Sequence, residues 1–151
     1  MRNHYVVTKE GKGFAIWDRC NRFFADIYPN SFTGKNAEAA AEKVAGELNE
    51  IEEGCDKWGL YWETVASTVD QDEVRYSLYA GRLSGTLIGS LYPLETRFTA
   101  HPERGAIRWA WREPGQHPQY TAMDGTLPQA KRDIEGLTIR FFDAEEAKRA
   151  G

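Results

Sequence analysis

The stretch that decides the fold is NAEAAAEKVAGELNEIEEG, residues 36–54. Its apolar side chains recur every three or four positions, which is the spacing of one face of an α-helix. Asn36 is a typical N-cap residue, and glycine is typical of helix ends, so the helix is expected to end at Gly54. Most of the apolar stripe is alanine, which lets a helix lie close against a sheet. The stripe consists of Ala37, Ala40, Ala41, Val44, Ala45, Leu48 and Ile51.

Short stretches rich in β-branched and aromatic residues surround this helix, and glycine-containing or polar turns separate many of them. They predict strands over 4–8, 14–18 and 22–28 before the helix, and over 58–69, 73–80, 96–100 and 106–112 after it. The glycine-containing segment 81–89 fits neither a strand nor a helix pattern clearly.

The C-terminal part predicts a short helix from Thr126 to about Glu135, a strand over Leu137–Phe142 and a terminal helix opened by Asp143. The fold class expected is therefore α+β, with antiparallel sheet, one long helix of the N-terminal half packed on it, and short C-terminal helices. A length of 151 residues suits a single domain, 1–151. A seam at 54–57 would separate strands plus helix, 1–54, from a β-rich part, 58–151.

Composition excludes several classes of protein. The formal net charge is −4, which argues against a strongly basic nucleic-acid binder. No run approaches the roughly 18 apolar residues that a membrane helix needs, and the first residues do not resemble a signal peptide. Two cysteines in unrelated contexts, Cys20 and Cys55, predict unpaired thiols and a cytoplasmic location. We expect a fold that depends on neither metal nor disulfide.

Motifs for catalysis or cofactor binding are missing from the sequence. His4, His101 and His117 lie in separate elements, without zinc-ligand spacing. The glycines Gly81, Gly85 and Gly89 match neither a dinucleotide nor a phosphate-loop fingerprint. The sequence therefore predicts no catalytic residues, no metal ligands and no cofactor, and indicates a protein that is not an enzyme.

The predicted helix is strongly acidic. Residues 38–56 hold seven acids against Lys43 alone, a net charge of −6. A rigid row of carboxylates resembles the charge spacing of a phosphate backbone and would attract a basic surface, although a solvated helix face explains the same pattern. The acids expected to face a partner are Glu38, Glu42, Glu52 and Glu53.

A second charged feature is basic. Arg108 and Arg112 alternate with Trp109 and Trp111, so the arginines should lie on the face opposite the tryptophans, with Arg97 nearby in sequence. Arginines beside aromatic side chains suit phosphate, carboxylate or protein partners, whereas ion pairs with the chain's own acids are the alternative. Aromatic residues of the opposite strand parity to the core suggest a second apolar sheet face. They are Trp17, Phe24, Tyr61, Tyr79 and Phe142.

The opening third resembles small phage and mobile-element accessory proteins. The resemblance rests on FAIWD at 14–18, KNAEAAAE at 35–42 and ELN at 47–49, a hairpin followed by an alanine-rich helix. It does not extend over residues 58–151. Anti-CRISPR and other anti-defence inhibitors are well represented among such proteins, and they work by occlusion without catalytic residues.

We therefore expect a non-catalytic protein that binds and inhibits a nucleic-acid-handling defence complex in the bacterial cytoplasm. Its partner would be a host protein or ribonucleoprotein with a basic surface; direct nucleic-acid binding is not expected, and a homo-oligomer is compatible with the sequence. One alternative is a small-ligand or nucleotide-binding module, or a small enzyme, that uses the arginine strand and the loop 113–124. Another is a phage structural or assembly protein.

Overall fold

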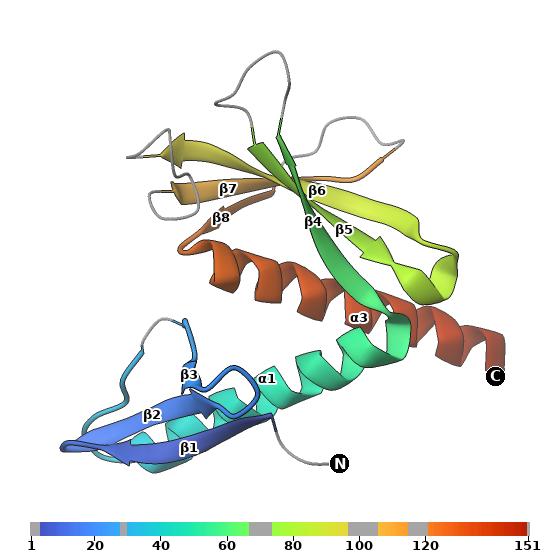
Figure 1. Ribbon diagram of the computed structural model, residues 1–151. Helices are drawn as coiled ribbons and strands as arrows, with labels where there is room; N and C mark the ends of the chain where they lie inside the picture. The colour runs from blue at the N-terminus through green and yellow to red at the C-terminus, as the bar shows by residue number, and fades with distance from the viewer. Residues whose placement is uncertain (1–3, 28–29, 67–73, 97–105, 115–120, 151) are drawn as a thin grey trace. The chain divides into compact units, whose positions relative to one another are not determined.

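The computed structural model describes residues 4–27, 30–66, 74–96, 106–114 and 121–150 (Figure 1). Within them lie two antiparallel sheets and two long α-helices, which confirms the α+β class. The chain divides into two compact units, residues 1–54 and 55–151, with the boundary inside the range 54–57 considered above. Each unit is described by itself.

The N-terminal unit begins with a three-stranded sheet in the order β1-β2-β3. Strand β1 is Tyr5–Glu10, β2 is Gly13–Asp18 and β3 is Phe23–Phe24, so the predicted strand 22–28 is shorter than expected. Glu10 pairs with Gly13, and Gly11 supplies the positive φ, 58°, that the tight turn requires.

Helix α1, Ala37–Trp58, is the predicted alanine-rich helix. Its buried alanines and Leu48 follow the expected stripe, and Asn49 joins it to the sheet: Tyr5 N–H donates to Asn49 Oδ1 (2.8 Å), while Asn49 Nδ2 donates to the Tyr5 carbonyl (2.9 Å). The helix does not end at Gly54, as predicted, but continues to Trp58. Gly54 is itself buried in the helix, and Gly59 (φ 65°) follows its end. The core of this unit comprises Tyr5, Ile16, Ala25, Ile27, Ala45 and Leu48.

The C-terminal unit contains a five-stranded sheet in sequential order, β4-β5-β6-β7-β8. The strands are β4 Leu60–Ala66, β5 Val74–Ala80, β6 Thr86–Thr96, β7 Ala106–Arg112 and β8 Thr121–Asp124. The ambiguous segment 81–89 forms a 3₁₀ turn, Gly81–Leu83, and then the start of β6. Strand β7 pairs with β6; of the partner predicted for it, 96–100, residues 97–100 lie outside the described residues.

Helix α3, Leu127–Ala150, corrects the prediction for the C-terminal part. It is one continuous helix, so the predicted strand Leu137–Phe142 is wrong and the two short helices are joined. Thr126 does cap it, since Gln129 N–H donates to Thr126 Oγ1 (3.4 Å). Asp143 lies within the helix rather than at a start, and accepts hydrogen bonds from Trp58 Nε1 (3.0 Å) and Lys57 Nζ (3.2 Å).

One face of the five-stranded sheet packs on α3, which runs along it in Figure 1. Trp109 is fully buried there and its Nε1 donates to the Gly125 carbonyl (2.9 Å). Among the tryptophans of this unit, Trp109 and Trp111 are buried, whereas Trp58 and Trp62 are half-buried. The buried members of this core are Tyr76, Leu78, Leu91, Trp109, Trp111, Leu127, Ala130 and Ile134.

Lys131 of α3 is half-buried beside this core. Its Nζ lies 5.5 Å from the ring centre of Trp62 and 5.2 Å from that of Tyr76. Burial lowers the pKa of Lys131 below its ordinary 10.5, opposed by the nearby Glu135. The unfolded chain therefore binds more protons than the folded chain between the lowered value and 10.5, so stability should rise with pH across that window.

We expect Lys131→Met to remove this alkaline rise in stability. The free energy of unfolding, measured by urea titration between neutral pH and the ordinary lysine pKa, should increase with pH more for the wild type than for the variant. Lys148→Met, at an exposed lysine of the same helix, is the control and should retain the wild-type slope. If the free energy of unfolding changes equally with pH in the wild type and in Lys131→Met, burial does not lower the pKa of Lys131.

Candidate binding surfaces and an apolar pocket

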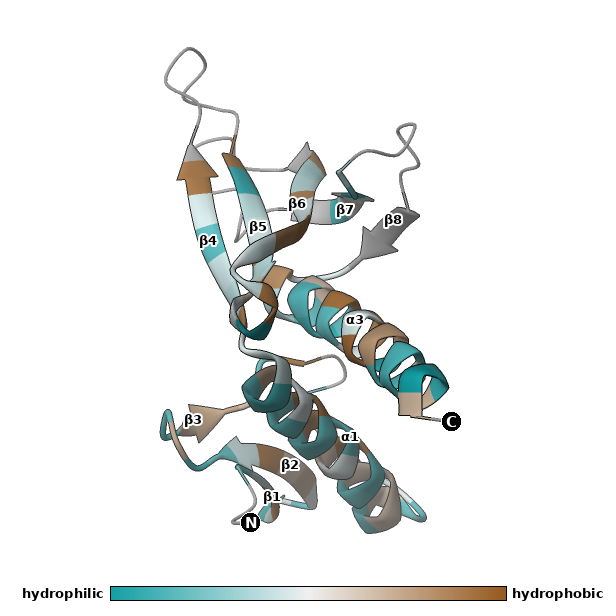
Figure 2. Ribbon diagram, turned by 90° about the vertical axis from the view of Figure 1, so that its right-hand side faces the viewer, coloured by the Kyte–Doolittle hydropathy of each residue, from teal (hydrophilic) through white to brown (hydrophobic). Residues whose placement is uncertain are grey.

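The predicted acidic surface lies along α1. Its inner face is fixed by the buried alanines, so most carboxylates project outward, and Glu38, Glu42 and Glu53 are exposed. Hydrophilic colouring extends over much of α1 in Figure 2. We call these three residues, with the equally exposed Glu47 and Glu50, the acidic face.

Glu52 does not belong to this face. It lies at the margin of the buried stripe and is half-buried, with its Oε2 3.8 Å from His4 Nδ1. Of the four acids expected to face a partner, Glu38, Glu42 and Glu53 are exposed and Glu52 is half-buried; their contact with a partner stays a prediction. Glu52 differs because the start of β1 brings His4 beside the helix.

The predicted basic residues lie on the sheet of the C-terminal unit. Arg108 and Arg112 are exposed and alternate with the buried Trp109 and Trp111, as expected; Arg97 lies outside the described residues. The same alternation on β5 places the exposed Arg75 opposite the core residue Tyr76, which the sequence analysis missed. Among the described residues of its strands, the face away from α3 therefore carries three exposed arginines.

Small polar residues lie on the same sheet face as these arginines. Ser77 and Ser90 are buried, and their hydroxyls are 2.8 Å apart across β5 and β6. Arg112 is the register partner of Ser90, so it lies next to this hydroxyl pair. Arg108 instead pairs in register with Glu95 and Asp124, so acidic positions flank it on both neighbouring strands.

Aromatic pairs occupy the outer sheet faces, as the strand parity predicts. Trp17 and Phe24 meet edge to face with ring centres 5.1 Å apart, and Tyr61 stacks on Tyr79 at 5.4 Å. Phe24 and Tyr61 are both more than 40% exposed, at 45% and 43%. Exposed aromatic side chains near charged residues are typical anchors of protein interfaces.

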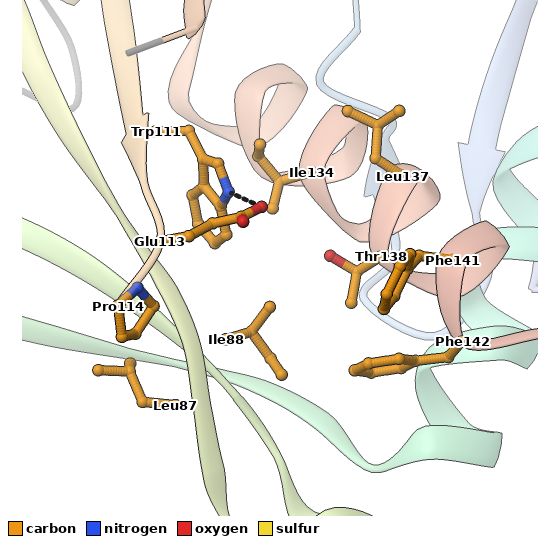
Figure 3. A pocket seen from close by; sticks show the side chains of 10 residues that line it. All are labelled: Leu87, Ile88, Trp111, Glu113, Pro114, Ile134, Leu137, Thr138, Phe141 and Phe142. Atoms are coloured by element: carbon orange, nitrogen blue, oxygen red, sulfur yellow. Dashed lines mark hydrogen bonds between the residues drawn. The ribbon is translucent and has the colours of Figure 1, made fainter. Parts of the chain in front are cut away.

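The C-terminal unit also holds an apolar pocket of about 560 Å³ between α3 and the sheet (Figure 3). Figure 3 shows side chains from the start of β6, the end of β7 and the residues after it, and the middle of α3 around one cavity. This volume falls in the range of small-molecule sites. The lining consists of Leu87, Ile88, Trp111, Glu113, Pro114, Ile134, Leu137, Thr138, Phe141 and Phe142.

Polar groups in this lining are few. The Glu113 carboxylate accepts a hydrogen bond from Trp111 Nε1 (3.3 Å), and Thr138 contributes a hydroxyl. Two apolar residues of the lining are exposed to a degree unusual for their type, Leu137 at 54% and Phe141 at 61%. Sequence reasoning missed the pocket because Leu137 and Phe141 were assigned to a strand.

Neither cysteine forms a disulfide, as predicted; Cys20 is exposed, and the Cys55 thiol donates to Glu135 Oε2 (3.2 Å). Of the other histidines, His101 and His117 lie outside the described residues. Neither α1 nor α3 has an apolar stretch of the length that crossing a membrane requires. No protein-family model matches the chain, and the searches of curated proteins and of solved structures also give no match.

Proposed function

We propose that this protein is a non-catalytic inhibitor that binds a basic surface of a nucleic-acid-handling defence complex, as anti-CRISPR proteins do. The observation that carries the proposal is the acidic face of α1. Its carboxylates are held at fixed intervals on a rigid helix, because the opposite side of that helix is buried.

Electrostatics explains why such a face suits this kind of partner. A surface that binds nucleic acid is rich in lysine and arginine, and a row of carboxylates presents complementary charge to it. Such complementarity accelerates encounter and selects the partner more than it adds affinity. The half-buried Trp17 and the exposed Phe24 of the same unit form an aromatic pair, which offers apolar contact area that charge alone does not supply.

The experiment is a plaque assay on bacteria that carry an active CRISPR system targeting the phage. Expression of the wild-type chain should raise the phage titre on immune cells and leave it unchanged on cells without the system. Expression of a charge-reversed variant, Glu38→Lys with Glu42→Lys and Glu53→Lys, should not raise it. Full immunity in the presence of the wild-type chain, across a panel of hosts with different CRISPR types, would contradict the proposal.

A second candidate function, binding of a small apolar ligand, is favoured by the pocket of the C-terminal unit. Two of its lining residues, Glu113 and Pro114, begin the loop 113–124 that the sequence analysis singled out. The apolar walls and the one carboxylate indicate a ligand with a hydrocarbon body and a cationic head, such as a long-chain amine.

Binding of n-alkylamines, measured by isothermal titration calorimetry, tests this candidate. Affinity should rise with chain length by about 0.8 kcal/mol per buried methylene, roughly fourfold each. Phe141→Ala should weaken binding with little cost to the fold, because Phe141 is exposed, whereas Phe24→Ala in the other unit should not. Affinity that is independent of chain length, or equal in both variants, would exclude the pocket as the binding site.

A further inference from the structure

Three side chains with metal-binding atoms converge at one end of the N-terminal sheet. His4 precedes β1, Asp18 ends β2, and Cys20 lies in the turn that follows. One ligand atom from each, a histidine nitrogen, a carboxylate oxygen and the thiol sulfur, lies within 4.8 Å of the other two. All three belong to the same compact unit.

Strand pairing, rather than sequence spacing, makes this cluster. Tyr5 is the register partner of Asp18, and Arg19 N–H donates to the His4 carbonyl (2.9 Å). The hairpin thereby holds His4 directly beside the turn. This explains why the sequence, which has no local ligand motif here, predicts no metal site.

The Asp18 carboxylate is fixed in place before any ion arrives. It is buried, with an exposed fraction of 3%, and Oδ1 accepts the backbone N–H groups of Cys20 and Asn21, each at 3.0 Å. Its Oδ2 accepts Asn21 Nδ2 at 2.8 Å.

The histidine is oriented as metal-bound histidines usually are. Its Nε2 faces Asp18 Oδ1 at 2.6 Å, and its Nδ1 faces Glu52 Oε2 at 3.8 Å. The Glu52 carboxylate lies on the side of the second ring nitrogen, at a separation longer than a hydrogen bond, and a carboxylate in this position is common behind metal-bound histidines. This arrangement also accounts for Glu52, the one predicted acid that turns away from the acidic face.

We propose that His4 Nε2, the Asp18 carboxylate and Cys20 Sγ form a three-ligand site for a divalent transition metal, Zn²⁺ by donor type. Nitrogen, oxygen and sulfur donors together are typical of tetrahedral zinc. Cys20 is exposed, so solvent reaches this cluster. To bind the ion, His4 Nε2 gives up any hydrogen that it donates to Asp18 and the Cys20 thiol loses its proton, and these protons are released to solvent. The two core clusters of the described residues contain none of the three ligands, so we expect the fold not to depend on the metal.

Cobalt(II) is the probe, because a thiolate bound to Co²⁺ gives a charge-transfer absorption in the near ultraviolet. The reduced full-length chain should develop this band with one equivalent of Co²⁺ and lose it when Zn²⁺ is added. Cys20→Ser should abolish the band, whereas Cys55→Ser, the matched control at the other thiol, should retain it. Circular dichroism of both variants should match the wild type, since neither thiol lies in a core.

Two further variants distinguish a residue that binds the metal, His4, from a residue that orients it, Glu52. His4→Gln should lower Zn²⁺ affinity strongly, and Glu52→Gln should lower it by about tenfold or more, the usual effect of losing a group that orients a metal-bound histidine. A wild-type chain without the band overturns the proposal. So does a band that survives in Cys20→Ser.

Discussion

Replacing Trp109 by alanine is expected to lower the free energy of unfolding by about 3–5 kcal/mol, the usual loss for a large aromatic side chain removed from a core. Trp109 is fully buried between the five-stranded sheet and α3, and contacts Tyr76 with ring centres 5.9 Å apart. The substitution therefore leaves a cavity and deletes an aromatic contact. Urea unfolding followed by circular dichroism measures the loss.

The control for this prediction is Tyr61→Ala on the opposite face of the same sheet. Tyr61 is 43% exposed, so its removal should cost much less than that of Trp109. Similar losses for the two variants would mean that the face toward α3 is not the main core of this unit.

Reversing charge at Glu38, Glu42 and Glu53 is expected to weaken binding to the basic partner by more than about tenfold, or 1.4 kcal/mol. Stability should change little, because exposed charges contribute little to folding; Glu38, in the first turn of α1, adds about 0.3–1 kcal/mol through the helix dipole. Titration of the partner with both proteins by calorimetry gives the affinities.

The matched control for charge reversal changes the same number of exposed acids elsewhere, Glu10, Glu63 and Asp133. Both triple variants shift the net charge equally, so a general effect of charge would weaken both. A loss confined to the α1 variant locates the contact on the acidic face. Equal losses would leave net charge alone as the explanation.

The fold could be predicted best where the apolar residues of a segment follow one regular spacing. Helix α1 was evident because its stripe repeats over several turns, while its end was misplaced because Gly54 packs inside the helix instead of stopping it. In α3, the segment 137–142 is β-branched and aromatic and looks like a strand locally. The burial of Leu127, Ala130, Ile134 and Thr138 at helical spacing decides otherwise, and that packing depends on the sheet.

The same distinction, between local spacing and tertiary packing, applies to the candidate sites. Exposure of Glu42 or Arg112 follows from the period of its own element, so the sequence suffices. The pocket takes its lining from β6, the end of β7 and α3, and the cluster of His4, Asp18 and Cys20 depends on hairpin register. Such sites arise from tertiary pairing, which no local pattern encodes.

The most direct test of the proposed function is the salt dependence of the association rate with the defence complex that the plaque assay identifies. Raising ionic strength from about 0.1 M to 1 M shortens the screening length from about 10 Å to 3 Å. The account predicts that the rate constant of the wild type falls steeply over this range, and that the α1 triple variant binds slowly at both concentrations. A wild-type rate that is insensitive to salt, or equal to that of the variant, would contradict binding through the acidic face.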